Sequence, residues 1–273
     1  MDKKFIQIFK GLERNFGFAN VHNGYTDPET GKLKLKNGDY GWSSKPITEQ
    51  DYQDHLSGKR SIGIQACDDE GMARFGAIDI DPEYKKFSPQ KYLEIIKENN
   101  IPVVPCSSKS GGLHIFVFTK EPVKAEVIRN FLDTLLFTFK LESSTEIFPK
   151  QTKLGTDETG KKLNGNFINL PYFNKTERCA LNLDGTKFNF EEFIQLVEAN
   201  KKTEVELYDF SLAHVKSVLQ GGHEEFFDGP PCLQILTKSK LNDGRDRFLY
   251  NYMVFAKKKY PDDWEKKVEK AAR

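Results

Sequence analysis

The sequence predicts an α+β fold in which helices cover β-sheets, followed by a small all-helical module. Up to about residue 200, strand-like and helix-like segments follow the order β-β-α-β-β-α-β-β, which lacks the regular alternation of a parallel doubly wound sheet. After about residue 205 the segments are helix-like and no clear strand pattern remains. We therefore predict an α+β domain over residues 1–205 and a helical module over residues 206–273.

Apolar spacing and capping residues predict the helices of the first domain. Phe5, Ile8 and Leu12 recur at helical spacing, and Ser88-Pro89 supplies an N-cap followed by a first-turn proline. Residues 48–51 have the composition of a helix start. The predicted helices are residues 3–14, 48–56, 88–100, 122–140 and 190–200.

Alternating or β-branched runs between turn residues predict the strands. Residues 61–65 and 72–81 flank the turn at residues 68–71, so we expect these two strands to form a hairpin. Pro102 and Pro105 place a further strand at a sheet edge or a bulge. The predicted strands are residues 32–36, 61–65, 72–81, 101–106, 113–118, 145–148 and 166–170, and residues 151–165 form a polar loop.

Composition limits the class of protein. The chain has 41 Lys and Arg against 40 Asp and Glu, a net charge of +1, which argues against a surface coated in positive charge for gripping duplex DNA. Local basic clusters remain, and each is more typical of a solvated face than of a binding site. They are Lys32-Lys34-Lys36, the group Lys238, Lys240, Arg245 and Arg247, and Lys257-Lys258-Lys259.

The sequence also predicts the compartment. The 4 cysteines form no Cys-x-x-Cys pair, so neither a zinc knuckle nor a disulfide framework is indicated. No apolar run approaches the ~20 residues that span a bilayer, and the N-terminus does not have the pattern of a signal peptide. We expect a cytoplasmic protein with no membrane partner.

Asp79 and Asp81 are the first candidate site residues. They end the apolar run Phe75-Gly76-Ala77-Ile78, and residues i and i+2 of a strand point to the same face. Two adjacent anions repel and raise each other's pKa unless a cation lies between them, and Mg²⁺ takes oxygen ligands of this kind. The alternative is a strand that ends in a polar turn, because Pro82 follows at once.

A phosphate-binding turn is predicted between residues 107 and 113. Glycines and small hydroxyl residues ahead of a strand expose backbone N–H groups that can cradle phosphate oxygens. The candidate residues are Ser108, Lys109, Ser110, Gly111 and Gly112. Lys109 adds a point charge, and His114 starts the next strand, where its imidazole can donate to a phosphate. The alternative for His114 is a structural histidine.

Glu146 is a candidate third carboxylate, followed by Lys150. Two-metal phosphoryl transfer uses about three carboxylates around ions ~3.5–4 Å apart, and Glu146 would complete the set begun by Asp79 and Asp81. The alternative is an ordinary exposed glutamate at a strand end.

Four ordered motifs together resemble the archaeo-eukaryotic primase superfamily, and more narrowly the primase–polymerases of phages, plasmids and TOTE-type conflict systems. The motifs are Asp79-Ile80-Asp81, Ser108-Lys109-Ser110-Gly111-Gly112-Leu113-His114, Glu146-Ile147-Phe148-Pro149-Lys150-Gln151 and Gly165-Asn166-Phe167-Ile168-Asn169-Leu170-Pro171-Tyr172-Phe173. His55-Leu56-Ser57-Gly58-Lys59 is similar to the leader of the same clade. The resemblance covers about residues 45–195. It departs from the family at Glu146, where many members carry aspartate.

The resemblance implies an RRM-like catalytic core and a set of site residues. It implies that Asp79, Asp81 and Glu146 hold two Mg²⁺ or Mn²⁺ ions. It further implies that an incoming nucleotide is bound by His114, the turn before it, Lys150 and Asn169. The implied partners are single-stranded DNA template, NTPs or dNTPs, and a helicase domain in cis or in trans. The implied setting is a phage or mobile-element protein acting in the cytoplasm of a host cell.

The leading hypothesis is therefore a DNA primase–polymerase, which performs template-directed, metal-dependent nucleotidyl transfer. A metal-dependent glycosyltransferase is a rival, but that fold requires a nucleotide-binding βαβ half before the Asp-x-Asp pair, which residues 1–70 do not offer. The other rival is a single-strand-binding module with a decayed active site. In such a module, the bases of the bound strand would stack on aromatic side chains. The candidates are Phe116, Phe118, Phe148, Phe167, Tyr172 and Phe173.

The helical module generates a prediction about initiation. Residues 206–220 and 243–273 are predicted helices, and Asp262-Asp263-Trp264 opens a final helix that runs to Arg273 without a stop signal, which suggests a longer parent chain with a helicase domain. Starting a chain requires a template and two nucleotides to be held without a primer duplex, so an additional basic surface matters most at that step. We expect residues 1–205 to extend an annealed primer but to lose most de novo primer synthesis in a gel assay. Equal priming by the soluble truncated protein would exclude an initiation role.

Overall fold

The structure is a computed structural model that describes residues 2–28, 33–83, 87–219, 230, 233 and 245–272. It divides into two compact units, Met1–Tyr208 and Asp209–Arg273. The domain boundary expected after residue 205 falls within helix α6 (Glu204–Leu219), which continues across this division. Leu207 of α6 is fully buried, so a truncation that spares the first unit ends no earlier than Tyr208.

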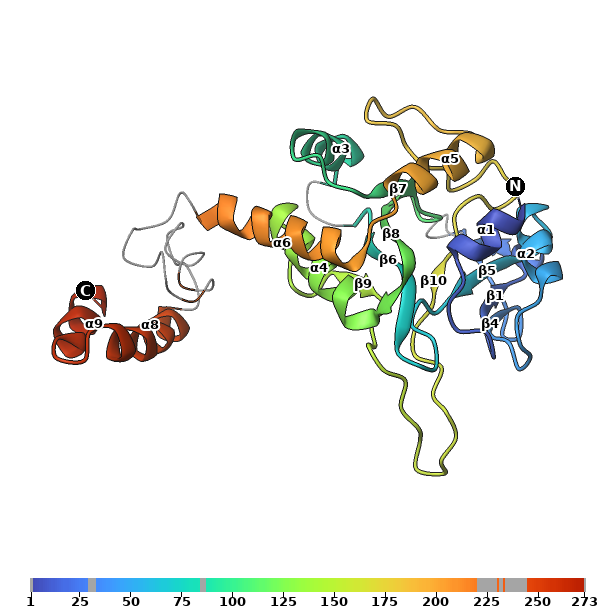
Figure 1. Cartoon of the computed structure of the whole chain (residues 1–273). Helices are drawn as coiled ribbons and strands as arrows, with labels where there is room; N and C mark the ends of the chain where they lie inside the picture. Colours follow the sequence, from blue (N-terminus) through green and yellow to red (C-terminus); the bar gives the residue numbers. More distant parts are fainter. Residues whose placement is uncertain are drawn as a thin grey trace. The chain divides into compact units, whose positions relative to one another are not determined.

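The first unit confirms the predicted α+β fold, with antiparallel sheets and helices (Figure 1). The N-terminal sheet has the strand order β10 (Ile168–Asn169), β5 (Ser61–Ile64), β1 (Gly17–Ala19) and β4 (Tyr40–Trp42). The central sheet has the order β7 (Val104–Ser107), β8 (Leu113–Lys124), β6 (Met72–Ile80) and β9 (Glu146–Phe148). A separate ribbon joins β2 (Tyr25–Thr26) to β3 (Leu33–Lys34).

The helices of this unit begin where their sequences supply caps. Thr48 and Asn189 each form a capping box with the acidic residue three positions later, at the starts of α2 and α5. No helix in the described part of the chain is both long and apolar enough to cross a bilayer. The helices besides α6 are α1 (Asp2–Ile8), the 3₁₀ helix η1 (Val21–Asn23), α2 (Glu49–Leu56), α3 (Pro89–Glu98), α4 (Ala125–Thr138) and α5 (Phe190–Asn200).

One aromatic core joins the two sheets. Phe9 follows α1, is fully buried, and meets Phe75 of β6 and Phe116 of β8 edge-on, with ring centroids 5.2 and 5.6 Å away. Its ring also stacks on Phe193 of α5 at 6.3 Å. Ile62 of β5 belongs to the same buried cluster, so one face of the N-terminal sheet packs onto the central sheet. Aromatic pairs at such distances add to the burial energy of their rings.

The other face of the central sheet is covered by α4. A Cβ atom on Gly76 of β6 would lie 2.3 Å from Cγ2 of Ile128 and 2.6 Å from the carbonyl oxygen of Phe148. Glycine is therefore required for this close approach of α4 and β9 to β6. With one face against α4 and the other against the aromatic core, β6 is held rigidly at the centre of the sheet.

The predicted hairpin of residues 61–65 and 72–81 is wrong. The turn forms as expected, with the Asp68 side chain accepting from the backbone N–H groups of Glu70 and Met72. However, β5 lies between β1 and β10 in the N-terminal sheet, whereas β6 lies between β8 and β9 in the central sheet. Turn residues indicate that the chain changes direction locally, but they do not specify which strand pairs with the strand that follows.

Other elements also differ from the prediction in their bounds. The strand β8 continues to Lys124, so the predicted helix 122–140 begins only at Ala125; Met72 and Ala73 pair with Lys124 and Val123 beyond a β-bulge in β6. The helix α1 ends at Ile8, although Leu12 is buried as its spacing predicted. The short strands β1 and β4 were not anticipated.

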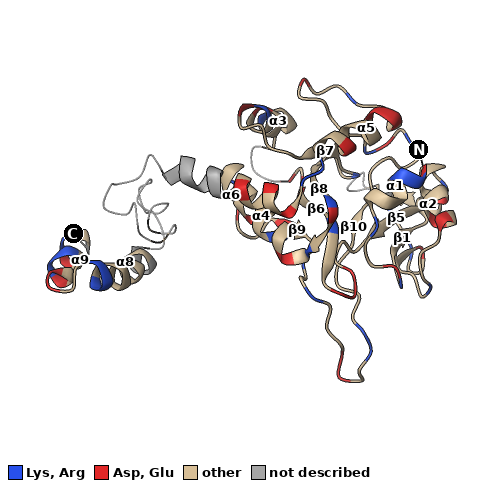
Figure 2. Cartoon of the chain, viewed as in Figure 1, with Lys and Arg blue, Asp and Glu red and all other residues tan. Residues whose placement is uncertain are grey.

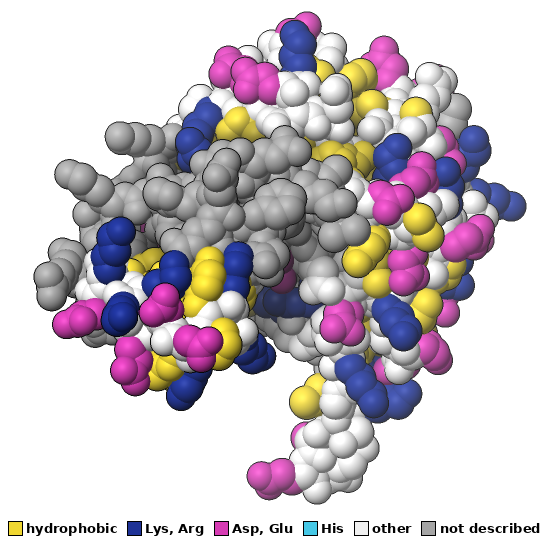
Figure 3. All heavy atoms as spheres, turned by 60° about the vertical axis from the view of Figure 1, so that its left-hand side comes forward, with side chains coloured by type: hydrophobic (Ala, Val, Ile, Leu, Met, Phe, Trp, Pro, Cys, Tyr) yellow, Lys and Arg dark blue, Asp and Glu magenta, His cyan; other side chains and the backbone are white. Residues whose placement is uncertain are grey.

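Residues 151–165 form a projecting arm whose two ends are clamped (Figures 1 and 3). Arg14 donates to both carboxylate oxygens of Asp69 (3.1 and 3.2 Å), to Oδ1 of Asn164 (2.6 Å) and to the Leu163 carbonyl (2.5 Å). At the neck, the Gln151 side chain donates to Oδ1 of Asn166 at 2.7 Å. The arm thus leaves and re-enters the body at fixed points, between β9 and β10.

The second unit contains α8 (Arg245–Lys259) and α9 (Trp264–Ala272), which pack around Phe248, Tyr252 and Phe255. Lysines lie over aromatic rings, with Lys257 Nζ 4.7 Å from the Trp264 ring and Lys267 Nζ 4.1 Å from the Tyr260 ring. Figure 3 shows charged and hydrophobic side chains mixed on this unit. Lys32, Lys238 and Lys240, expected in basic clusters, lie outside the described residues.

Candidate active site

The candidate site is built on a cross-strand row at one end of the central sheet. Asp79 lies near the end of β6 and pairs directly with Glu146 of β9 on one side and with His114 of β8 on the other. Residues opposite each other in antiparallel strands share a face, with Cβ atoms about 4.5–5.5 Å apart. Figure 2 shows acidic residues on the ribbon around β6 and β9. The register therefore brings three of the predicted site residues together.

His114 is the hydrogen-bonding partner of Asp79 in this row. Its Nε2 lies 3.2 Å from Oδ1 of Asp79, and the imidazole is 6% exposed. The ring also meets Phe116 edge-on at 5.8 Å, which fixes its plane. In this structure His114 orients the Asp79 carboxylate.

Asp81 lies one residue beyond β6 and adds a second carboxylate. Partial burial raises the pKa of its carboxyl group above the ordinary value, and the charges of Asp79, Glu83 and Glu146 raise it further, while His114 opposes them. This is the mutual perturbation expected of carboxylates that share one site. The end of β6 therefore gathers carboxylates that perturb one another.

Lys150 is the cationic partner of Glu146. The two residues lie four positions apart in the sequence, and their side chains form an ion pair. Lys150 Nζ lies 5.3 Å from the centre of the Phe148 ring. Arg129 of α4 donates to the carbonyls of Pro149 and Lys150 at 3.0 and 2.6 Å, which holds this segment against the sheet.

The predicted phosphate-binding turn joins β7 to β8 beside the carboxylates. The Ser108 N–H donates to the Gly112 carbonyl at 2.9 Å, and the hydroxyls of Ser108 and Ser110 lie 3.1 Å apart. Gly111 has φ +88°, and a Cβ there would meet nothing within 4 Å. A Cβ on Gly112 would lie 2.2 Å from the Ile80 carbonyl, so glycine allows the turn to touch the residue before Asp81.

Arg178 is a site residue that the sequence analysis missed. It is 7% exposed, and its Nη1 donates to Oγ of Ser61 at 2.9 Å and to the Leu170 carbonyl at 3.3 Å. Its Nε is buried and, among the described residues, has no hydrogen-bond partner. Burial lowers the pKa of the guanidinium to about 10, with Glu177 opposing the shift. A buried cation with an open donor is suited to a bound anion.

Arg178 acts together with Lys109. Burial lowers the pKa of the Lys109 ammonium, and the nearby positive charge of Arg178 lowers it further. The segment after β10 brings them together, because Cys106 of β7 pairs with Ala180 and the Ser107 N–H donates to the Cys179 carbonyl at 3.0 Å. Two cations beside a glycine turn are chemically suited to a bound anion.

Two buried side chains fix the segment between Asn169 and Arg178. His55 accepts from the Ile62 N–H at Nδ1 (3.2 Å), so its Nε2 carries the proton and donates to the Pro171 carbonyl (2.9 Å). Burial lowers the pKa of His55 to about 4, which keeps it neutral. The Tyr172 hydroxyl donates to the Phe188 carbonyl at 2.9 Å and accepts from the Ala180 N–H at 3.1 Å.

The carboxylates fit a divalent cation by their chemistry but are not arranged around one. Three acidic groups converge from neighbouring positions, and burial together with the charges of the other carboxylates raises the pKa of Asp81. Within the described residues, no three His, Cys, Asp or Glu side chains form a group that would hold a metal ion. One oxygen of Asp79 faces His114 and one oxygen of Glu146 faces Lys150, so these partners would either remain as hydrogen-bond donors to a metal-bound carboxylate or be displaced.

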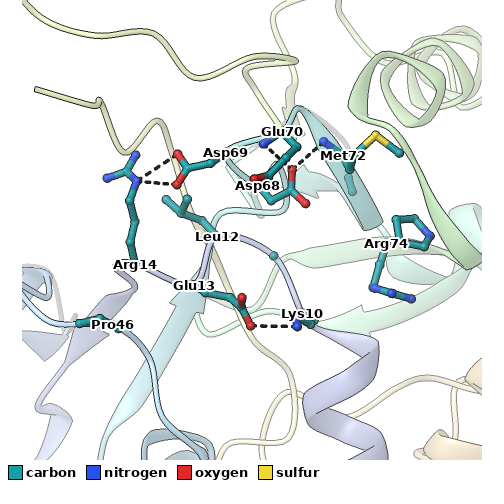
Figure 4. A pocket seen from close by; sticks show the side chains of 13 residues that line it. Lys10, Leu12, Glu13, Arg14, Pro46, Asp68, Asp69, Glu70, Met72 and Arg74 are labelled. Carbon is teal, nitrogen blue, oxygen red and sulfur yellow. Dashed lines mark hydrogen bonds and ion pairs between the residues drawn. The ribbon is translucent and has the colours of Figure 1, made fainter. Parts of the chain in front are cut away.

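A pocket of about 600 Å³ lies elsewhere in the unit (Figure 4). Its walls include Arg14, Asp69 and Met72, and Figure 4 shows the Arg14 guanidinium bonded to Asp69 across it. Met72 starts β6 and Asp79 lies seven residues further along, a distance of about 23 Å in a strand. The pocket therefore does not belong to the candidate active site.

Comparisons with known proteins match the chain to a family model and to a distant solved structure. The family model described as "TOTE conflict system, Archaeo-Eukaryotic Primase domain" matches residues 9–206. A solved structure titled "Crystal structure of primase RepB'" aligns with 99% of this chain and 91% of its own, at 9% identity and a TM-score of 0.29. No curated protein matches the chain.

Charge repulsion at the end of β6 predicts the behaviour of Asp81→Asn. Because the folded-state pKa of Asp81 is raised, its ionised form destabilises the fold, and this cost is present above the folded pKa and vanishes as pH falls below the unfolded value. We expect Asp81→Asn to raise the Tm by about 1–3 °C at pH 7.5 in chelator, and the gain to shrink towards about pH 4.

The measurement is thermal unfolding followed by circular dichroism across this pH range. Asp133→Asn is the matched control, since Asp133 is an exposed carboxylate on α4, and we expect no change in its Tm. A lower Tm for Asp81→Asn than for the parent at neutral pH would contradict the repulsion.

Proposed function

The chain belongs to the archaeo-eukaryotic primase family, whose TOTE-type domain it carries over residues 9–206, and we propose on this premise that it is a DNA primase–polymerase. The match confirms the resemblance drawn from the motifs. In the proposed reaction, the protein positions a 3′-hydroxyl and a nucleoside triphosphate on a single-stranded DNA template and transfers the nucleotidyl group. It forms no covalent intermediate and acts by position and charge.

The observation that carries the proposal is the row Glu146–Asp79–His114 beside the glycine turn. Carboxylates from two adjacent strands and a phosphate-binding turn meet at the end of one rigid sheet. Nucleotidyl transfer requires this combination, because cations must be held between the triphosphate and the attacking hydroxyl.

Asp79, Asp81 and Glu146 are the residues that would hold Mg²⁺ or Mn²⁺. When bound, these ions would lower the pKa of the attacking hydroxyl and neutralise charge on the leaving pyrophosphate. His114, released from Asp79, lies one residue beyond the turn and can donate to a phosphate oxygen. Lys150, released from Glu146, can do the same.

The triphosphate is assigned to the turn and to the cations around it. The backbone of Gly111 is open to solvent, Lys109 supplies a charge at the surface, and Arg178 offers an open donor below it. Asn169 lies on β10, at the other end of the segment that carries Arg178. The substrates are NTPs or dNTPs, and the template is single-stranded DNA.

The partners and setting follow from the same proposal. Lysines over aromatic rings in the second unit suit contacts with a nucleic-acid backbone and its bases, which supports a role for this unit in holding template during initiation. A helicase domain, in cis or in trans, would supply the single strand. The protein would act in the cytoplasm of a host cell, as a phage or mobile-element protein.

The pairing of Asp79 with His114 and of Glu146 with Lys150 favours one alternative, a single-strand-binding module without catalysis. Primer extension separates the two functions. A purified protein that binds single-stranded DNA but incorporates no nucleotide in Mg²⁺ or Mn²⁺, with or without a primer, would support the alternative.

The metal-site assignment predicts loss of incorporation. We expect Asp79→Asn and Asp81→Asn each to reduce nucleotide incorporation at least about 100-fold, because the carboxylates that hold the cations are removed. Glu146→Gln should reduce it less, since the family varies at this position. The measurement is a gel assay with labelled nucleotide, template and primer, with Asp133→Asn as control. Normal incorporation by both aspartate variants would refute the assignment.

The anion site predicts a separation of nucleotide from template binding. We expect Lys109→Ala, His114→Ala and Arg178→Lys to weaken nucleotide binding about 10- to 100-fold, the range of a lost charge-assisted hydrogen bond, with little effect on oligonucleotide affinity. Arg178→Lys keeps the charge and removes the fork that reaches Ser61.

Labelled nucleotide and labelled oligonucleotide are titrated separately against each variant. Lys97→Ala, an exposed lysine in the last turn of α3, is the control. An effect confined to the oligonucleotide would move these residues out of the nucleotide pocket.

A further inference from the structure

We propose that a pocket near the start of β6, remote from the candidate active site, is a second binding site for a phosphate group, with Arg74 as its principal donor. This pocket, here called the Arg74 pocket, has a volume of about 360 Å³ and is lined by residues of α1, β6 and β8 and by Lys201, which follows α5. Asp79 lies five residues beyond Arg74, about 17 Å along a strand. The inference goes beyond the proposed function, because the lining contains none of the candidate active-site residues.

A β-bulge brings Arg74 to this pocket. Ala73 pairs with Val123 and Phe75 pairs with Phe118, so Arg74 alone lies opposite residues 119–122 of β8. The regular ladder is interrupted there, and bulges of this kind re-aim a side chain away from the direction it would take in a regular strand. The Arg74 carbonyl accepts from the Thr119 hydroxyl at 3.1 Å, which fixes the backbone from which the guanidinium extends.

The walls of the Arg74 pocket are held in place without a ligand. The Lys120 N–H donates to the Lys202 carbonyl at 2.9 Å, and the Lys202 N–H donates to the Phe118 carbonyl at 3.0 Å. Phe75 and Phe118, which flank the bulge, are 0% and 1% exposed. Because the backbone is already ordered, a ligand that enters the pocket loses little affinity to the cost of ordering it.

The guanidinium of Arg74 has donors to offer a ligand. Arg74 is partly buried, and among the described residues its side chain has no hydrogen-bond or ion-pair partner. It also lines the neighbouring pocket of Figure 4, where no dashed line joins its side chain to the residues drawn around it. A guanidinium is always charged and presents five N–H donors in a planar fork that matches phosphate oxygens.

The other charged side chains of the lining are mostly cationic. The lining contains Lys10, Arg74, Lys120 and Lys201 against one carboxylate, that of the exposed Glu121. Each lysine has a glutamate partner, in the pairs Lys10–Glu13, Lys120–Glu206 and Lys201–Glu198. The first two pairs are exposed, and such pairs contribute at most about 1 kcal/mol, so their ammonium groups can turn towards a bound anion at little cost.

The arrangement of these cations favours a phosphate over a carboxylate. The two oxygens of a carboxylate lie in one plane, and a single guanidinium fork satisfies both of them. A phosphate group presents its oxygens tetrahedrally, so it gains from donors that approach from several directions. Here the donors come from three separate segments, with Lys10 after α1, Arg74 on β6 and Lys120 on β8.

The Arg74 pocket offers no aromatic ring on which a base could stack. Phe118 lines it but is 1% exposed, so its ring faces the core. Most of the aromatic residues considered for stacking in the sequence are buried in the same way, with exposures of 0–4%: Phe116, Phe118, Phe148, Tyr172 and Phe173. Recognition therefore rests on the phosphate, which can belong to a mononucleotide or to a nucleic-acid backbone. The volume is at the lower end of the range for small-molecule sites.

The first experiment follows thermal unfolding of the full chain in chelator. Inorganic phosphate, thymidine monophosphate (dTMP) or acetate replaces chloride at constant ionic strength. Every protein carries Lys109→Ala, which weakens the candidate nucleotide site, so that the remaining response reports on the Arg74 pocket. We expect phosphate and dTMP to raise the Tm in a concentration-dependent manner and acetate to have little effect. A response to acetate as strong as that to phosphate would overturn the assignment of a phosphate.

Substitution of Arg74 then tests the donor. We expect Arg74→Gln to weaken the phosphate Kd about 10- to 100-fold, the range for lost charge-assisted hydrogen bonds, and Arg74→Lys to weaken it less, since the charge remains and the fork is lost. The matched control is Arg60→Gln, which removes a guanidinium that pairs with Asp51 and should leave the Kd within about twofold. In chloride alone Arg74→Gln should unfold at the Tm of the parent, because its side chain holds no other residue in place. If Arg74→Gln is destabilised, Arg74→Lys provides the comparison.

A second measurement distinguishes the two sources of the phosphate. Labelled oligo(dT) of about 20 nucleotides is titrated by anisotropy at several salt concentrations, again without metal. If the ligand is a nucleic-acid backbone, Arg74→Gln weakens oligo(dT) binding and reduces the slope of log K against log salt by about 1. If the ligand is a mononucleotide, Arg74→Gln loses the response to dTMP and binds oligo(dT) as the parent does. A variant that keeps the parent's phosphate, dTMP and oligo(dT) affinities would overturn the proposal. None of these results depends on catalysis, since no metal is present.

Discussion

The crowding of carboxylates at the end of β6 is the constraint on which the site depends. Asp79 lies near the end of β6, a central strand paired on both sides, so its backbone is held beside Glu146 and close to Asp81. Charge of one sign in so small a space is tolerated only with cations near it. The structure places His114 of β8 against Asp79 and pairs Lys150, which follows β9, with Glu146.

A second constraint concerns how two sheets share one site. The central sheet carries the acids, whereas Asn169 and the support of Arg178 belong to the N-terminal sheet. The segment from Pro171 to Ala180 joins them, and its backbone is fixed by the neutral imidazole of His55 and the buried hydroxyl of Tyr172. The buried polar side chains of His55 and Tyr172 therefore fix this segment, whereas the buried Nε of Arg178 has no hydrogen-bond partner among the described residues.

The sequence was sufficient to predict the strand that ends near Asp79 and the glycine turn before His114. Both predictions rest on patterns of neighbouring residues, which local conformational preferences determine. Arg178 could not be found in this way. It follows Asn174-Lys175-Thr176-Glu177, which has the composition of a solvated loop, and only tertiary packing buries it. The false hairpin has the same origin, since a turn does not specify a partner strand. The strands β1 and β4 have three residues each, too few for a periodic signal.

The clamp on the arm has a consequence for how this chain can change over time. Arg14 and the Gln151–Asn166 contact hold the two ends of the arm. A change in the length of the arm therefore does not move Glu146 or Asn169. Lengthening the tip near Gly160 would cost only loop-closure entropy, about 0.6 kcal/mol for each doubling. The tip is therefore a point at which an inserted domain, acquired by recombination or added as a tag, leaves the chemistry of the sheets intact.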